Sequence, residues 1–304
     1  MKPFLLEAVC KDHIWGGSRL RGFGKVSESD RIAESWELST HPDGESIITT
    51  GSSRGMKLGT FLKAHPETAA MMGRPFDPLP VIVKLIDAHE DLSVQVHPDK
   101  TELWYVIDAE PGATVLYGFE HEVTPEDYAH AIREENLLSL MKHIPVKAGD
   151  VFLIPEGTLH SIGKGLLLAE VQQNSNITYR VYDYHRGREL HIAQALPGTN
   201  LKPVTNPPSH PAVPFSPEKG GTVQILGGCR YFSSCICNIR SHRESNGSIS
   251  YEHLLVLDGW ATLSTEDGSL QIQKGNSVFI PAGTAYDLWG ECRLLSTTTV
   301  PDGC

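Results

Sequence analysis

The chain of 304 residues has no apolar run that approaches the roughly 20 residues of a membrane-spanning helix. Its N-terminal segment, MKPFLLEAVCKDH, contains an apolar stretch that is too short for the hydrophobic region of a secretory signal. The sequence therefore predicts a cytoplasmic protein that makes no use of a membrane.

Cysteines at paired metal-binding spacing are also lacking. The six cysteines are Cys10, Cys229, Cys235, Cys237, Cys292 and Cys304. Because the cytoplasm keeps thiols reduced, we interpret them as ordinary thiols. Cys235 and Cys237 would share one face of a strand, and a zinc site there is the alternative interpretation.

Positive charge is in deficit. The chain has 26 Lys and Arg against 37 Asp and Glu, a formal net charge of −11. This balance favours solubility and works against general binding to nucleic acid or to anionic membranes. A phosphorylated ligand would need a local pocket of basic side chains.

Short segments typical of strands fill most of the chain from about Leu79 onward. They are rich in Val, Ile, Leu, Tyr and Phe and are separated by Gly, Pro and Asp, as in LPVIVKLIDA, LSVQVHP, ELWYVID and DVFLIP. This pattern predicts a mainly β sandwich or barrel. Between about 123 and 145 a small helical insertion is expected, because Thr124 can cap a helix and Pro125 suits its first turn.

Proline and glycine are dense between Pro197 and Gly221. Such a composition is typical of an extended linker. We therefore predict an N-terminal domain over residues 1–196, a linker over 197–221 and a C-terminal domain over 222–304.

An internal repeat relates the two predicted domains. GDVFLIPEGTLH, which ends at His160, matches GNSVFIPAGTAY, which ends at Tyr286, and ELWYVID from Glu102 aligns with EHLLVLD from Glu252. Two related β units follow from this repeat. The second has Tyr286 in place of His160 and Gly247 opposite His97, so the sequence predicts a metal only in the first unit.

Three residues of the first unit are candidate metal ligands: His97, Glu102 and His160. Alternation along LSVQVHP sends Ser93, Gln95 and His97 to one face of a strand. A reversal at PDKT would bring Glu102 beside His97. Two imidazoles and a carboxylate are ligands that zinc accepts in catalytic sites, where a further position stays open. The alternative is that both histidines are merely hydrogen-bonded core residues.

This arrangement resembles the two motifs of the cupin superfamily, with Gln95, His97 and Glu102 in the first and Gly149 to His160 in the second. The resemblance implies two cupin-type (jelly-roll) β-barrel units, the second without a metal. Gln95 stands where many cupins carry histidine, and it is either a fourth ligand or a substrate contact.

A more specific resemblance covers Trp15 to about Leu196. The strings IWGG, ESWELSTHPDGES, VIVKLIDAHEDLSVQVHPDKTELWYVID, IPEGTLHSI and LAEVQQNSNITYRVYDY resemble type I mannose-6-phosphate isomerases of the short bacterial form. The resemblance implies interconversion of mannose 6-phosphate and fructose 6-phosphate through a cis-enediol. One zinc ion per chain is implied on His97, Glu102 and His160.

The same resemblance implies further site residues. Arg180 and Lys100 are the expected catalytic residues, and Ser93, Gln95, Lys84 and Glu170 are expected to contact substrate. Arginine stays cationic at neutral pH, so Arg180 suits an electrostatic clamp rather than a base. Asn176 replaces an Asp that is frequent in related sequences, and the residue that acts as base stays open.

Other interpretations of these residues are retained. Lys84 could extend from an apolar run to solvent, Lys100 could be a solvated turn residue, and Arg180 could pair with Asp183 or Glu170. For function, a non-catalytic sugar-phosphate-binding protein and an isomerase of another phosphorylated sugar are the alternatives. The expected partner is a small-molecule sugar phosphate, and the chain would be a monomer or a homodimer.

Overall fold

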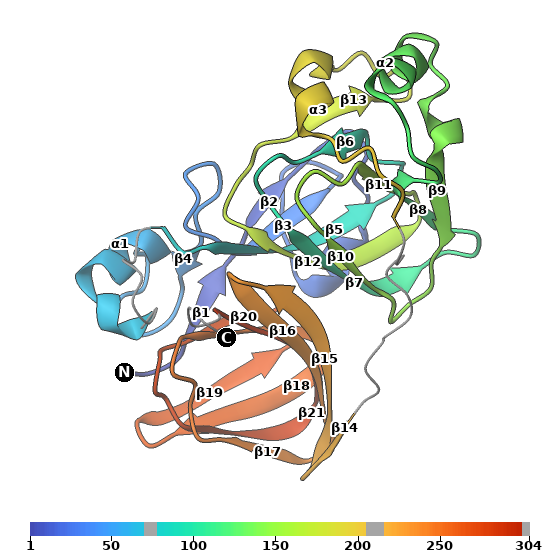
Figure 1. Cartoon of the computed structure of the whole chain (residues 1–304). Coiled ribbons are helices and arrows are strands. Elements are labelled where there is room, and N and C mark those ends of the chain that lie inside the picture. The colour runs from blue at the N-terminus through green and yellow to red at the C-terminus, as the bar shows by residue number, and fades with distance from the viewer. Residues whose placement is uncertain (70–77, 205–215, 300–304) are drawn as a thin grey trace.

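The computed structural model describes residues 1–69, 78–204 and 216–299, and these are mainly β, as predicted (Figure 1). Three sheets are present in these ranges. Their strands cover most of the segments in which the sequence alternates apolar runs with Gly, Pro and Asp. Among the described residues, no helix combines the length and apolar character needed to cross a membrane.

The first unit is built from two sheets. The six-stranded sheet has the order β10-β7-β12-β5-β3-β2: Val151–Ile154, Glu102–Ala109, Leu166–Gln173, Val81–Ala88, Glu34–Leu38 and Val9–Lys11. The five-stranded sheet has the order β13-β6-β11-β8-β9: Tyr179–Tyr182, Val94–Val96, His160–Ile162, Thr114–Phe119 and Met141–Pro145.

The second unit is a ten-stranded sheet. Its main path is β14-β15-β16-β21-β18-β20-β1-β4: Ser216–Glu218, Gly221–Cys229, Phe232–Ile239, Tyr286–Thr298, Glu252–Thr265, Ser277–Ile280, Phe4–Glu7 and Ile47–Ile48. Strand β17 (His242–Ser245) pairs with β21, and β19 (Gly268–Gln273) pairs with β18.

Helices are few and short in the described ranges. They are α1 (Leu58–Ala64), α2 (Pro125–Arg133) and α3 (Ile192–Gly198), with 3-10 turns η1 (Arg19–Phe23), η2 (Pro66–Thr68) and η3 (Leu137–Leu140). Helix α2 begins where Thr124 and Pro125 predict it, and the Thr124 side chain accepts a hydrogen bond from the Asp127 amide. The last five residues of the expected insertion, 141–145, form strand β9 instead.

Apolar layers alternate with the sheets. One core cluster lies between the six- and five-stranded sheets and includes Trp104, Phe152 and Tyr117. A second joins the outer face of the six-stranded sheet to the second unit. A third packs α2 and α3 on the five-stranded sheet, as Figure 1 shows at the top of the molecule. Because both faces of the six-stranded sheet are covered, its central strands β5 and β12 are buried almost throughout and consist mainly of apolar residues.

The N-terminus ties the two units together. Strand β1 pairs with β20 of the second unit, with Phe4 opposite Phe279, and β4 pairs with β1. Two strands of the predicted N-terminal domain thus belong to the C-terminal sheet. Of the predicted linker, residues 205–215 lie outside the described residues, and the boundaries drawn from the sequence stay a prediction.

Strand pairing agrees with the internal repeat. Ile154 lies opposite Glu102 in the first unit, and Ile280 lies opposite Glu252 in the second.

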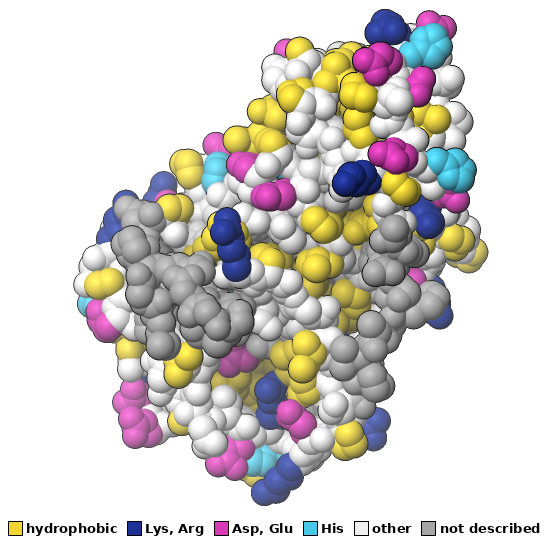
Figure 2. Space-filling model, in the orientation of Figure 1, with side chains coloured by type: hydrophobic (Ala, Val, Ile, Leu, Met, Phe, Trp, Pro, Cys, Tyr) yellow, Lys and Arg dark blue, Asp and Glu magenta, His cyan; other side chains and the backbone are white. Residues whose placement is uncertain are grey.

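Acidic and basic side chains are interspersed on the face in Figure 2 and form no broad patch of one sign there.

Phe279 is expected to contribute strongly to the packing between the units. Its fully buried ring stacks on Phe4 and Tyr251, with centroids 5.1 and 5.2 Å away. We expect Phe279→Ala to lower the free energy of unfolding by about 3–5 kcal/mol, because the cavity adds to the lost burial. Urea denaturation measures this change in the free energy of unfolding. Ile225→Ala, at a side chain 58% exposed, is the matched control, and equal losses in both variants would contradict the packing role.

Candidate metal centre and active-site pocket

One pocket collects the predicted site residues. It lies between the two sheets of the first unit and has a volume of about 530 Å³. The predicted residues that line it are Lys84, Ser93, Gln95, Lys100, Glu102, Glu170 and Arg180. His97 and His160 do not line the pocket and lie against Glu102, one of its lining residues.

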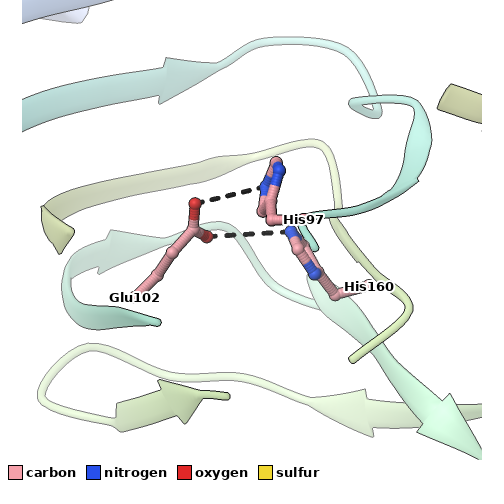
Figure 3. Close-up of side chains that lie close together, drawn as sticks. All are labelled: His97, Glu102 and His160. Atoms are coloured by element: carbon pink, nitrogen blue, oxygen red, sulfur yellow. Dashed lines mark ion pairs between the residues drawn. The ribbon is translucent and has the colours of Figure 1, made fainter. Parts of the chain in front are cut away.

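Strand alternation explains how the three candidate ligands converge. Val94 and Val96 of β6 are buried against the helices, which turns Gln95 and His97 toward the opposite sheet. Glu102 begins β7 and His160 begins β11. Glu102 Oε1 lies 3.2 Å from His97 Nε2, and Glu102 Oε2 lies 3.7 Å from His160 Nε2 (Figure 3). A ligand atom from each lies within 4.8 Å of the other two, which is close enough to hold one ion.

Both imidazoles are oriented by their second nitrogen. His97 Nδ1 lies 2.8 Å from the Ile177 carbonyl oxygen, and His160 Nδ1 lies 2.8 Å from that of Thr158. A proton on Nδ1 leaves Nε2 with a lone pair, the arrangement found in metal-binding histidines. Burial lowers the pKa of both histidines, and the Lys100 ammonium lowers that of His97 further. Both rings are therefore neutral near pH 7.

Two polar atoms at the centre of the cluster lack partners. Glu102 Oε2 and His160 Nε2 are buried and accept no hydrogen bond from the described residues. Leaving such atoms unpaired costs on the order of 1–3 kcal/mol each. A bound cation would satisfy both, so the residues present fit a metal ion.

Lys100 keeps Glu102 ionised. Burial alone would raise the pKa of the Glu102 carboxyl, but the Lys100 ammonium, 2.9 Å from Oε1, holds that pKa well below its usual range. Only 3% of Lys100 is exposed, so its interpretation as a solvated turn residue is wrong.

A second group of buried charges lies beside the first. Lys84 Nζ is 3.1 Å from Glu170 Oε1 and 3.6 Å from Glu34 Oε2. Burial would lower the pKa of Lys84, but these carboxylates outweigh it and raise the pKa. Lys84 is 5% exposed and does not extend to solvent.

Glu170 has a carboxyl pKa that is displaced upward. Burial and repulsion from Glu102 raise it to about 7, although Lys84 works in the opposite direction. The Trp104 indole donates a hydrogen bond of 2.9 Å to Glu170 Oε2 and fixes the carboxylate in place. A carboxylate that titrates near neutral pH in a pocket is suited to proton transfer.

Arg180 lies at the other wall. Its Nε donates to Ser93 Oγ at 3.3 Å, and its Nη1 donates to the Glu189 carbonyl at 2.8 Å. Asp183 instead binds Arg186 and Arg188, so the expected alternative of an Arg180–Asp183 pair is not what forms.

Gln95 lies between His97 and Ser93. Its Nε2 is 3.4 Å from His97 Nε2, and its Oε1 accepts a hydrogen bond from Ser93 at 3.3 Å. Rotation of the amide would exchange the two atoms, so both roles considered for Gln95 stay open.

The N-terminal strands add pocket residues that the motifs did not single out. Glu34 and Trp36 of β3 line the pocket, and so do Lys11 of β2 and Arg188. Glu34 and Trp36 alternate on one strand within ESWELS, which is the signal that could have identified them. In the second unit, Tyr286 donates a hydrogen bond of 2.7 Å to Glu252, the counterparts of His160 and Glu102.

Comparisons with known proteins point to one family. Two family models match: "Phosphomannose isomerase type I, catalytic domain" over residues 4–136, and "Mannose-6-phosphate isomerase, cupin domain" over residues 223–299. Mannose-6-phosphate isomerase ManA of Bacillus subtilis is 31% identical, with 93% of this chain and 94% of ManA covered. The mannose-6-phosphate isomerase of Streptococcus mutans is 33% identical, with 92% of each chain covered.

Solved structures agree. The crystal structure of the mannose 6-phosphate isomerase from Bacillus subtilis superimposes with a TM-score of 0.90 at 32% identity, and 98% of this chain and 99% of that chain are covered. A mannose 6-phosphate isomerase structure described as bound with zinc and yttrium has a TM-score of 0.76 at 15% identity, which shows the shared fold. The predicted mainly β, cupin-type fold is confirmed.

Removal of His160 should abolish tight metal binding. We expect His160→Ala to weaken binding of a divalent ion by more than about 100-fold, because one of three ligands is lost. Metal content after dialysis and calorimetric titration measure this. His143→Ala is the control, since that exposed histidine bonds only the Leu138 carbonyl. Equal metal content in the two variants would contradict the site.

Proposed function

The chain belongs to the type I phosphomannose isomerase family, and on this premise we propose that it interconverts mannose 6-phosphate and fructose 6-phosphate with one zinc ion. The ion would be held by His97, Glu102 and His160. The observation that carries the proposal is the pair of unpartnered buried atoms, Glu102 Oε2 and His160 Nε2, beside a pocket lined by both cationic and carboxylate side chains. The relatives named as mannose-6-phosphate isomerases support the choice of substrate.

Zinc fits the donor set because two neutral imidazoles and one carboxylate leave a coordination position open. When bound, the ion supplies a Lewis acid that stabilises negative charge developing on the sugar oxygens. Gln95 is close enough to His97 to act either as a further ligand or as a substrate contact.

The reaction moves hydrogen within one molecule. A base removes the proton on C2 of the aldose, a cis-enediol forms, and a proton returns to C1, while the O2 hydroxyl proton moves to O1. We assign the base to Glu170, because its carboxyl has a pKa of about 7 and lines the pocket. Lys84 beside it offsets the negative charge of the carboxylate.

The remaining cations would stabilise anionic groups. Lys100 is retained as a catalytic residue, with its ammonium near the enediolate oxygens and its contact to Glu102 orienting that ligand. Arg180 and Ser93 would bind the phosphate, since a guanidinium stays charged and donates in a planar fork. Arg188, which also lines the pocket, adds a second guanidinium, held in place by Asp183.

Two alternatives remain distinguishable. A sugar-phosphate-binding protein without catalysis predicts tight binding and no turnover. An isomerase of another sugar predicts a higher kcat/KM on a substrate such as glucose 6-phosphate. The ionisable Glu170 in the pocket favours catalysis over binding alone.

The proposal also covers the cell compartment and the oligomeric state of the protein. We place the protein in the cytoplasm, which agrees with five free cysteines among the described residues. The chain is expected to be a monomer or a homodimer, which sedimentation analysis distinguishes.

Turnover should depend on bound metal. We expect the purified protein to convert mannose 6-phosphate in a coupled assay, to lose activity after treatment with EDTA and to regain it with zinc. The His143→Ala variant should behave like the wild type. A metal-loaded protein with no turnover on mannose 6-phosphate would refute the proposed reaction, and turnover that is indifferent to EDTA would refute the metal's part in it.

Glu170 should control the pH profile. A base must be unprotonated, so we expect kcat/KM to rise with pH through the pKa of Glu170, at about 7 or somewhat lower once a cation offsets the charge of Glu102. Glu170→Gln should lower kcat by about 10²- to 10⁴-fold and remove this rise. Lys100→Met is the comparison variant, since it should lower kcat and keep the rise. If Lys100→Met alone removes the rise, Lys100 and not Glu170 is the base.

A further inference from the structure

The interior of the second unit repeats the catalytic positions of the first with different chemistry. In the first unit, Glu170 lies opposite Lys84 on one side and Trp104 on the other. In the second, Ser296 lies opposite Cys235 on one side and Leu254 on the other. Since Glu252 corresponds to Glu102, strand pairing makes Cys235 the counterpart of Lys84 and Ser296 the counterpart of Glu170.

A second thiol joins Cys235 at this place. Strand β16 alternates, so that Phe232 and Ile236 face the first unit while Cys235 and Cys237 face the interior of their own unit. The two sulfur atoms lie 3.7 Å apart. Cys237 is fully buried and Cys235 is partly exposed, so solvent reaches one edge of the pair.

This separation fits a bridging metal better than a disulfide. Two thiolates bound tetrahedrally to zinc at about 2.3 Å lie about 3.8 Å apart. A disulfide needs sulfur atoms about 2.05 Å apart, and positions i and i+2 of a strand, about 6.6 Å apart, lie near the upper limit of its Cα range. Binding of an ion therefore needs less movement of the strand than oxidation.

The charged and hydroxyl groups around the two thiols are compatible with binding of a metal ion. The Arg243 guanidinium donates a hydrogen bond to Cys237 Sγ, and Ser296, which contacts Cys235, donates one of 2.5 Å to Glu252 Oε1. Arg243 and Glu252 carry opposite charges. Replacing the two thiol protons by one divalent cation leaves the net charge of this buried group unchanged, which avoids the cost of a buried uncompensated charge.

We propose that Cys235 and Cys237 form a second metal site, which binds a thiophilic divalent cation of the zinc and cadmium class. The protein supplies two thiolates, and the Arg243 N–H group stabilises one of them, as outer hydrogen bonds do for metal ligands. The site is independent of the proposed isomerase reaction and of His97, Glu102 and His160.

Cadmium titration of the full-length, reduced protein tests the proposal. Thiolate ligands give cadmium an ultraviolet charge-transfer absorption that histidine and carboxylate ligands do not give, so the two sites are distinguishable in one sample. We expect the band to saturate with one equivalent bound at the thiols and to persist in His160→Ala. Loss of isomerase activity would leave this result unaffected.

Matched variants identify the ligands. Cys235→Ala and Cys237→Ala should each remove the band or weaken cadmium binding at this site by at least about tenfold. Cys229→Ala, at a free and partly buried cysteine outside the pair, should leave it unchanged. Because Cys237 is buried, circular dichroism checks the fold, and the partly exposed Cys235 gives the decisive variant. No band in the wild type, or a full band in Cys235→Ala, would overturn the proposal.

Discussion

Charge pairing in a space largely closed to water is the constraint on which the rest of this structure depends. Lys84, Lys100, Glu102 and Glu170 are each at most 5% exposed, and Glu34 lies beside them. An isolated buried charge is costly, so each group persists only with an opposite charge at contact distance. The pairs are arranged unequally: Lys100 holds Glu102 ionised, while burial and the proximity of Glu102 raise the pKa of Glu170 to about 7. The same cluster of charges thus contains a permanent anion, Glu102, that is suited to binding a cation, and a titratable carboxyl, Glu170, that is suited to proton transfer.

The sheets make this arrangement rigid. Every charged residue of the group except Lys100 lies on a strand whose alternate residues are buried in a core layer, so a shift of one residue in pairing would expose apolar side chains and bury the polar ones elsewhere. Lys100 lies in the short turn between β6 and β7, and its contacts to Glu102 and Gln172 hold it. The strands also join the site to the second unit, since the outer face of the six-stranded sheet packs on β16, β18 and β21.

Much of the site was predictable because its signal is local. His97, Glu102 and His160 stand at strand ends whose spacing and alternation are readable in one sequence, and the mainly β fold follows from the same pattern. Glu34 and Trp36 were not singled out, because they reach the pocket only through pairing of β3 with β5, about fifty residues later in the chain. The burial of Lys100 was equally hidden: PDKT reads as a turn, and nothing local indicates that Gln172 and Glu102 enclose it. Pairing of β1 with β20 joins the two ends of the chain, a contact that no local pattern encodes.

Comparison of the two units shows how one framework supports two chemistries. Glu102 and Glu252 occupy the same register, but their surroundings differ: the Lys84–Glu170 pair of opposite charges corresponds to Cys235 and Ser296, which are neutral as thiol and hydroxyl. Replacing only one member of the pair would have left a buried charge without its partner, whereas replacing both keeps the balance. The Glu252 carboxylate accepts hydrogen bonds from the Tyr286 and Ser296 hydroxyls, whereas Glu102 contacts the Lys100 ammonium and its Oε2 accepts no hydrogen bond from the described residues. The requirement of neutrality that shapes the isomerase pocket is also met at the proposed second site, where one divalent cation would replace the two thiol protons.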